Sequence, residues 1–278
     1  MTPAAFANLA DMLRRRSGLV LTPDKMPLAN SRLAPVAHLF GFKGVASLLA
    51  EFPYPREEIA QAVTEAMTTN ETSFFRDREP FAYFRDVMLP ALTIARASTR
   101  RLRIWCAAVA TGQEAYSLAM LLDEANLAGF DWKIDLIATD LSAGAIARAK
   151  DGVYSQFEVQ RGLPIHALLK HFTQEGNQWR VNDRLRRMVS FRTFNLLDNF
   201  GWLGEIDVIF CRNVLLYFDS QSKSAAFARL GETLVPDGTL VLGATEIGAE
   251  SFVAAADAPR GFFVRSRIAA SRAAILSG

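Results

Sequence analysis

Cysteine and histidine are scarce in this chain. Its 278 residues include two cysteines, Cys106 and Cys211, and three histidines, His38, His166 and His171. Each cysteine lies within an apolar run that predicts a strand, so we expect two buried free thiols rather than a disulfide. His166 and His171 are five residues apart, a spacing that does not place two ligands on one face of a helix. The sequence therefore predicts no metal site.

Long apolar segments and a large net charge are also absent. Half of the residues are hydrophobic, yet no run of about eighteen residues is free of charged side chains, so no transmembrane helix is predicted. At the N-terminus the basic residues follow the apolar ones, the reverse of their order in a secretory signal. The net charge of +2 is too small to indicate nucleic acid as a partner. We expect a cytoplasmic protein without membrane insertion, and since nothing suggests an obligate assembly, a monomer.

Residues 1–66 are predicted to form a small all-helical domain. Apolar residues recur at helical spacing through this segment, and a linker helix from about residue 56 leads out of it. Its first fifty residues carry six arginines or lysines against two aspartates, a local charge of +4. A solvated helix face and a surface for an acidic partner both explain this bias, and the sequence leaves the choice open.

Residues 67–278 have a different pattern, in which short β-rich runs alternate with helical segments. The predicted strands are Leu102–Ala108, Ile134–Thr139, Met188–Phe194, Ile206–Cys211 and Thr239–Ala244. The predicted helices between them include Gln113–Ala125, Ala143–Lys150 and Gln221–Leu234. This alternation predicts an α/β fold, with a parallel sheet covered by helices on both faces. Residues 158–190 interrupt it, and the turn sequence Glu175-Gly176-Asn177 predicts a small inserted antiparallel β subdomain there.

Polar residues follow four of the predicted strands. In α/β folds ligands bind beyond the carboxyl ends of the strands. Gly112 follows the first strand and opens a helix, Asp140 ends the second, Asn195 follows the third, and Arg212-Asn213 follow the fourth. An acidic residue such as Asp140 commonly binds ribose hydroxyls, although it could instead cap the next helix. Asn195 has both a donor and an acceptor for an adenine edge. Nucleoside binding is the better interpretation.

Six stretches of the chain resemble the chemotaxis receptor methyltransferases, the CheR family. They are TNETSFFRD at 69–77, ATGQEAYSLAM at 110–120, IATDLS at 137–142, YSQFEVQRGLP at 154–164, DVIFCRNVLLYFD at 207–219 and PDGTLVLGATE at 236–246. The likeness extends from the helical block almost to the C-terminus. It implies a Rossmann-like class I methyltransferase domain that binds S-adenosylmethionine and releases S-adenosylhomocysteine.

The resemblance also implies roles for individual residues. The positions that match cofactor-binding residues of the family are Asn70, Thr72, Arg76, Glu114, Asp140, Asn195, Leu196, Arg212 and Asn213. Tyr217 matches a tyrosine near the methyl-transfer site, and we expect Arg76 and Tyr217 to serve catalysis. The chain departs from the family at Gly112-Gln113-Glu114-Ala115, where Gly-Glu-Glu-Pro is usual, and at Ala244, where histidine is common. Loss of the first acid is expected to be mild if Glu114 is the ligand, and no role is expected for the histidine.

The implied activity is transfer of a methyl group to glutamate side chains on the cytoplasmic helical bundle of chemoreceptors. A methyltransferase for another acidic protein or a small carboxylate would have the same cofactor site. A non-catalytic sensor of the cofactor is the alternative from a different class. A nucleic-acid methyltransferase is disfavoured, because the chain lacks an Asn-Pro-Pro-Tyr-type motif and any long basic segment interleaved with aromatic residues.

Overall fold

The computed structural model describes residues 1–52, 54–127 and 131–266, and the chain divides into two compact units. The first unit comprises Met1–Thr69, Asn195–Leu197 and Val214–Ala226. The second comprises Asn70–Phe194, Asp198–Asn213 and the chain from Phe227 onward. The two short segments at 195 and 214 therefore belong with the N-terminal block, although they are more than a hundred residues away from it in the sequence.

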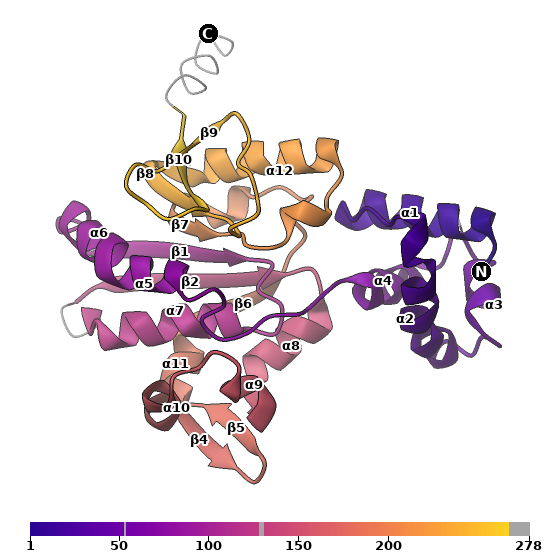
Figure 1. The fold of residues 1–278 in the computed structure, drawn as a ribbon, viewed down its shortest axis with the longest axis horizontal. Coiled ribbons are helices and arrows are strands. Elements are labelled where there is room, and N and C mark those ends of the chain that lie inside the picture. The colour runs from indigo at the N-terminus through magenta and orange to yellow at the C-terminus, as the bar shows by residue number, and fades with distance from the viewer. Residues whose placement is uncertain (53, 128–130, 267–278) are drawn as a thin grey trace. The chain divides into compact units, whose positions relative to one another are not determined.

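The first unit is helical, as its sequence predicts (Figure 1). Its elements are α1 (Pro3–Ser17), η1 (Pro23–Lys25), α2 (Met26–Leu39), α3 (Val45–Leu49), α4 (Glu57–Met67) and, from the later segment, η5 (Leu215–Tyr217) and the first part of α12 (Ser220–Thr233). The Ala5 backbone N–H donates to the Thr2 hydroxyl at the start of α1, and Gly18 ends that helix in the left-handed conformation. One face of each long helix is buried in a common apolar core that includes Leu9, Leu13 and Leu33.

Two of the basic side chains in this unit bind groups of the unit itself. The Arg32 guanidinium donates to the carbonyl oxygens of Met67 and Thr68, each at 2.9 Å, where α4 ends. Arg16 binds the Glu57 carboxylate at the start of α4. Part of the basic bias of the first fifty residues therefore holds α4 in place.

The second unit contains a seven-stranded sheet in the order β6-β2-β1-β7-β8-β10-β9. The strands are β1 (Arg101–Ala107), β2 (Lys133–Asp140), β6 (Val189–Thr193), β7 (Ile206–Phe210), β8 (Leu234–Val241), β9 (Phe252–Ala254) and β10 (Phe262–Arg265). The first five strands in that order are parallel to their neighbours, whereas β10 runs antiparallel to both β8 and β9. All five predicted strands are present, although β8 begins five residues earlier than predicted. The sheet is therefore mixed rather than wholly parallel as predicted, since β10 and the edge strand β9 add antiparallel pairs. These two short strands near the C-terminus have no distinct sequence pattern.

Helices accompany this sheet throughout the second unit (Figure 1). They are α5 (Glu79–Tyr83), η2 (Phe84–Met88), α6 (Leu89–Ala95), α7 (Gln113–Glu124), α8 (Ala143–Asp151), α9 (Gln156–Gln160), α10 (Ile165–His171), α11 (Asp183–Met188), η4 (Gly201–Leu203) and the end of α12. Both α7 and α8 pack against β2 and β6. The predicted helices at 113–125, 143–150 and 221–234 correspond to α7, α8 and α12 within about one residue at each end.

The inserted β subdomain is a three-stranded antiparallel sheet in the order β3-β5-β4. Its strands are β3 (Val153–Ser155), β4 (Phe172–Glu175) and β5 (Gln178–Val181), and the predicted turn joins β4 to β5. The sheet starts at Val153, upstream of the predicted boundary at residue 158. The Phe74 ring packs edge-on against Tyr154 of β3 and Phe172 of β4, with ring centroids 5.0 and 5.5 Å apart. A core aromatic pair therefore ties this small sheet to the segment that precedes α5.

Both cysteines are buried and unpaired, as predicted. Burial raises the pKa of each thiol well above its usual value, so neither is a reactive thiolate. Among the described residues, no group of three or more histidine, cysteine or acidic side chains could hold a metal ion. No helix within the described ranges is long and apolar enough to cross a membrane.

Candidate functional site

Asp140 joins the loops that follow β1 and β2. Its two carboxylate oxygens accept hydrogen bonds from the backbone N–H groups of Ala110, at 2.8 Å, and Ser142, at 2.9 Å. The residue that caps α8 is Ser142, whose hydroxyl accepts from the Ala145 N–H. The alternative interpretation of Asp140 as the helix cap is therefore wrong. Its carboxylate is buried at the carboxyl end of the sheet and shapes the loop 108–112.

The turn between β1 and α7 requires a glycine, and Gly112 supplies it. It adopts a left-handed conformation with φ +98°, and a Cβ atom there would lie 2.9 Å from the Cβ of Ala149 and 3.0 Å from the Tyr154 hydroxyl. Tyr154 donates to the Thr111 carbonyl oxygen at 2.7 Å, which fixes the turn from the side of β3. The turn thus lies directly against α8 and β3, and the N-terminus of α7 opens at the ligand-binding edge of the sheet.

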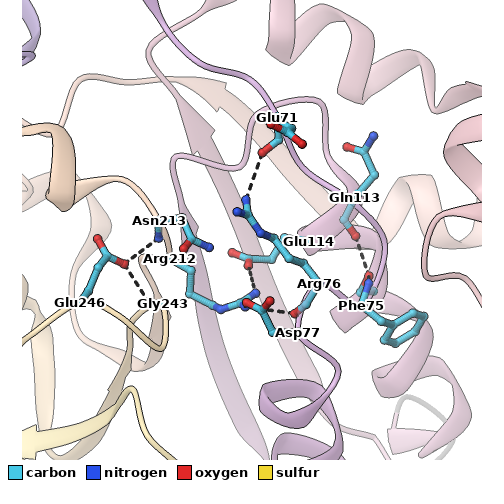
Figure 2. A network of polar contacts seen from close by, with 11 residues as sticks. Glu71, Phe75, Arg76, Asp77, Gln113, Glu114, Arg212, Asn213, Gly243 and Glu246 are labelled. Atoms are coloured by element: carbon cyan, nitrogen blue, oxygen red, sulfur yellow. Dashed lines mark hydrogen bonds and ion pairs between the residues drawn. The ribbon is translucent and has the colours of Figure 1, made fainter. Parts of the chain in front are cut away.

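Arg212 is the centre of a buried polar network just beyond β7 (Figure 2). Its side chain is 1% exposed. One Nη donates to the Glu114 carboxylate at 2.8 Å, and the other donates to the Asp77 carboxylate at 2.6 Å and the Arg76 carbonyl oxygen at 3.0 Å. Three segments that are far apart in the sequence therefore meet at one guanidinium: the segment 70–77, the first turn of α7 and the loop after β7.

The charges of this network are strongly desolvated. Burial raises the pKa of the Glu114 carboxyl, and the neighbouring positive charges of Arg212 and Arg76 act in the opposite direction. The Arg212 Nε is buried and has no hydrogen-bond partner within the described structure. An unsatisfied buried donor is costly in a stable core, and such groups are frequent at functional sites. The network thus combines a buried ion pair with an unpaired buried donor at the carboxyl end of β7.

The segment 70–77 is held on α7 by its backbone. The Phe75 N–H donates to the Ser117 hydroxyl at 2.9 Å, and Ser117 in turn donates to the Gln113 carbonyl oxygen. The Arg76 side chain folds back so that its Nη1 donates to the Glu71 carbonyl oxygen at 3.1 Å (Figure 2). Arg76 is half-buried, whereas Asn70 at the start of the segment is exposed and Thr72 is half-buried. The structure therefore brings Arg76 next to Glu114 and Arg212, with Asn70 and Thr72 on the same short segment.

Glu246 joins the loops that follow β7 and β8. Its Oε2 accepts hydrogen bonds from the Asn213 N–H at 2.6 Å and the Gly243 N–H at 2.8 Å (Figure 2). A Cβ atom on Gly243 would lie 2.6 Å from Asn213 Oδ1, so only glycine leaves room for the Asn213 side chain. Sequence reasoning did not select Glu246 or Asp77 as site residues, although each is the last acidic residue of a stretch that resembles the family.

Backbone strain is concentrated in the loops of this site. Six non-glycine residues there have positive φ angles, which range from 47° to 67°, namely Phe75, Asp77, Arg78, Ala108, Ala110 and Asn213. Such conformations cost free energy unless the surrounding structure imposes them, and they cluster at active sites and ligand clamps. Tertiary contacts hold these loops in shape.

Three predicted site residues belong to the first unit. Leu196 is buried, and Tyr217 is 41% exposed. Asn195 donates from Nδ2 to the Arg16 carbonyl oxygen at 2.6 Å, and its Oδ1 accepts from the Leu197 N–H at 3.0 Å. An asparagine amide has two N–H donors and two lone pairs, so Asn195 retains one of each for a ligand.

The donor and acceptor groups of the second unit match the chemistry of S-adenosylmethionine. Its ribose hydroxyls require acceptors at the end of β2, which Asp140 supplies, and its ammonium group requires a carboxylate such as Glu114. The carboxylate of the cofactor requires a cation, and the Arg76 guanidinium, which lies next to Glu114, is suited to that role. The left-handed loop at 108–112 opens toward the same edge of the sheet. The residues present therefore fit this cofactor.

Comparison with known proteins gives a consistent result. The family model described as CheR methyltransferase, SAM binding domain, matches residues 70–252. Chemotaxis protein methyltransferase 1 of Pseudomonas aeruginosa is 40% identical over 238 residues, which cover 84% of this chain and 86% of that protein. Chemotaxis protein methyltransferase Cher2 of Pseudomonas putida is 38% identical and covers 87% and 89%. The chemotaxis protein methyltransferase of Vibrio parahaemolyticus is 36% identical and covers 87% and 88%.

Proposed function

Since the chain belongs to the CheR methyltransferase family and transfers methyl groups from S-adenosylmethionine, we propose that its acceptors are glutamate side chains on the cytoplasmic helical bundle of chemoreceptors. The products are glutamyl methyl esters and S-adenosylhomocysteine. The observation that carries the proposal is the network in which the buried side chains of Arg212 and Glu114 bind each other and Arg212 also binds the half-exposed Asp77 carboxylate, beside Arg76. It lies within the matched domain, and the relatives named above are chemotaxis methyltransferases.

The proposed cofactor-binding residues of the second unit divide into two groups. Asp140 and the turn at Gly112 bind the nucleoside end, where Asp140 already accepts two backbone hydrogen bonds. Glu114 and Arg76 bind the amino-acid end of the cofactor, while Arg212 and Asn213 hold the side chains of the site in position. Asn70 and Thr72 contribute polar groups from the segment that carries Arg76. Asn195 and Leu196 complete the proposed set on the adenine side.

The chemistry requires little from the protein beyond positioning. Bound S-adenosylmethionine supplies a methyl group on a positively charged sulfur with a good leaving group. A glutamate with a pKa near ~4.3 is ionised at neutral pH, so no general base is required to make the nucleophile. Alignment of the reacting atoms and exclusion of water can contribute on the order of 7–11 kcal/mol. We propose that Arg76 and Tyr217 orient the acceptor carboxylate in this way.

Arg76→Ala is expected to lower kcat/KM for methyl transfer by tenfold or more. The substitution removes a cation that lies beside Glu114 and is suited to binding a carboxylate in bidentate fashion. Steady-state kinetics with varied cofactor and varied acceptor will show which of the two substrates is affected. Arg78→Ala is the matched control, because Arg78 is an exposed arginine two residues away. Near-normal kinetics of Arg76→Ala would remove this residue from the proposed site.

Glu246→Ala is expected to weaken binding of S-adenosylhomocysteine by tenfold or more. Two backbone N–H groups lose a charged acceptor, each worth about 1.5–3 kcal/mol, and the loop that carries Asn213 loses its anchor. Glu246→Gln keeps an acceptor oxygen and is expected to retain most of the affinity. Calorimetric titration measures both variants, with the exposed Glu250→Ala as control. Unchanged affinity in Glu246→Ala would contradict the anchoring role.

We further propose that the protein acts as a cytoplasmic monomer with an N-terminal helical domain at 1–66, a methyltransferase domain at 67–278 and an inserted β subdomain at 158–190. The division of the chain into a helical unit and an α/β unit supports this organisation. The absence of a membrane-spanning helix among the described residues is compatible with it.

One measurement tests the proposed acceptor directly. The protein is incubated with S-adenosylmethionine labelled on the methyl group and with a cytoplasmic chemoreceptor fragment, and the labelled fragment is then treated with mild alkali. Release of the label as methanol identifies a glutamyl ester. If no methyl group is transferred but S-adenosylhomocysteine still binds tightly, the proposed acceptor is wrong. The result would then favour another acidic protein or a small carboxylate as acceptor, or a non-catalytic sensor of the cofactor.

A further inference from the structure

The stretch 154–164 resembles the family, yet most of it has no role in the proposed site. It runs from β3 through α9 to the residue before α10, within the second unit. Gly162, near its end, has a φ angle of +95°, and the carbonyl oxygen of Phe74 leaves no room for a Cβ atom there. The chain at 161–162 therefore lies directly against the segment 70–77.

The two halves of the segment 70–77 are held differently. In the second half, the backbone of Phe75 and Arg76 binds side chains of α7 and of the loop after β7. In the first half, none of residues 70–74 takes part in a backbone–backbone hydrogen bond within the described part of the chain. A segment without such bonds depends on side chains for its position.

Arg161 supplies a side-chain contact to this first half. Its Nη2 binds the Glu71 carboxylate at 2.7 Å, and this hydrogen bond is the main cause of the lowered pKa of Glu71. Among the described residues, it is the one hydrogen bond that residues 70–73 make outside their own segment. The Glu71 carbonyl oxygen in turn accepts from Arg76 Nη1 at 3.1 Å (Figure 2). Two successive contacts thus link Arg161 to the Arg76 guanidinium.

The exposure of this ion pair separates its effect on position from its effect on stability. The side chains of Arg161 and Glu71 are 49% and 65% exposed. Exposed ion pairs contribute little to the free energy of unfolding, because water and salt screen the charges. Misplacement of a substrate-positioning group by about 1 Å can nevertheless lower a rate on the order of a hundredfold. A loss of activity without a loss of stability is therefore the expected signature of positioning.

We propose that Arg161 is a positioning residue for methyl transfer, which holds Glu71 and through it the Arg76 guanidinium in place. This inference rests on the proposed role of Arg76 and adds the contact that orients it. The absence of a side chain at Gly162 lets the chain lie against Phe74, which brings Arg161 within hydrogen-bonding distance of Glu71.

Arg161→Ala is expected to lower kcat/KM for methylation of the receptor fragment by about tenfold, while the midpoint of denaturant unfolding stays at the wild-type value. Glu71→Ala removes the carboxylate but keeps the carbonyl oxygen that Arg76 binds, and it is expected to have the same effect. Arg161→Lys keeps the positive charge and is expected to retain most of the activity. Arg101→Ala is the matched control, because Arg101 is also 49% exposed and binds a carboxylate at 2.7 Å, at the amino end of β1.

A double-mutant cycle identifies the group through which Arg161 acts. If that group is Arg76, the variant Arg161→Ala/Arg76→Ala is expected to be no less active than Arg76→Ala alone. Arg161→Ala is also expected to change the same parameter as Arg76→Ala, whether the KM for the cofactor, the KM for the acceptor or kcat. A merely structural role would instead multiply the two fold-losses. The affinity for S-adenosylhomocysteine of the same variants completes the cycle without an acceptor.

The outcomes separate this role from the proposed function. Wild-type kinetics in Arg161→Ala, with Arg76→Ala impaired, would overturn the positioning role and leave the proposed function standing. An equal loss in Arg101→Ala, a lowered unfolding midpoint in Arg161→Ala, or fold-losses that multiply in the double variant would also overturn it. Near-normal kinetics and affinity in Arg76→Ala would exclude Arg76 from the site, and the positioning role would fail with it. If the wild type transfers no methyl group to the fragment, the proposed acceptor is wrong, and the cycle in S-adenosylhomocysteine affinity still decides the role of Arg161.

Discussion

Replacement of Arg212 by methionine is expected to lower the free energy of unfolding by about 3–5 kcal/mol and to abolish methyl transfer. Arg212 is almost fully enclosed and compensates the buried carboxylate of Glu114. Loss of one partner of a buried ion pair leaves the other charge without compensation, which costs more than the pair itself contributes. The same substitution releases the Asp77 carboxylate and the Arg76 carbonyl oxygen, so the segment that carries Arg76 loses its anchor.

The loss of stability in Arg212→Met is expected to depend on pH. Burial already raises the pKa of Glu114, and removal of the positive charge of Arg212 raises it further. A carboxyl whose pKa is higher in the folded than in the unfolded state favours folding below its unfolded pKa. This contribution is lost as pH rises through the folded pKa. The deficit of Arg212→Met relative to the wild type should therefore be larger at pH 8 than at pH 5.

Denaturant unfolding of both proteins at these two pH values measures the deficit. The double variant Arg212→Met/Glu114→Gln carries no buried charge at these positions, so it should regain much of the stability at pH 8 but none of the activity. An equal deficit at both pH values, or no recovery in the double variant, would show that Glu114 is not the charge that Arg212 compensates.

Asp140→Ala is expected to reduce the affinity for S-adenosylhomocysteine by a hundredfold or more. The variant loses two charge-assisted hydrogen bonds, to the backbone N–H groups of Ala110 and Ser142, worth about 1.5–3 kcal/mol each. Ala110 has a φ angle of 51°, and without the carboxylate its loop is expected to relax toward an unstrained conformation. The proposed acceptor for the ribose hydroxyls is lost at the same time.

Titration calorimetry on two further variants distinguishes these contributions. Asp140→Asn keeps one acceptor oxygen and should lie between the wild type and the alanine variant. Asp198→Ala removes an exposed aspartate that follows another strand, β6, and should bind as the wild type does. Wild-type affinity in Asp140→Ala would exclude Asp140 from the cofactor site, and a comparable loss in Asp198→Ala would show that the effect is not specific.

The sequence by itself determined the class of fold and the order of its elements. Alternation of β-rich and helical segments depends on local periodicity, so strands such as Leu102–Ala108 and helices such as Gln113–Ala125 were predicted within one residue or so at most ends. The strands β9 and β10 were missed, because each has four residues or fewer and no regular alternation. Position after the predicted strands also indicated that Gly112, Asp140 and Arg212 lie at the carboxyl edge of the sheet, since that edge is where parallel strands end, whereas Glu114 was implied by the resemblance to the family.

Only the tertiary structure decided which of these groups touch. Glu114 and Arg212 are 98 residues apart, and no local pattern pairs them across two strands of the sheet. The role of Glu246 depends on its hydrogen bonds to two backbone N–H groups in different loops. Local sequence fixes backbone preferences within a few residues, whereas contacts between distant segments follow from how the whole core packs. For that reason the sequence predicted candidate residues for the site, and the packing of the chain determined their partners.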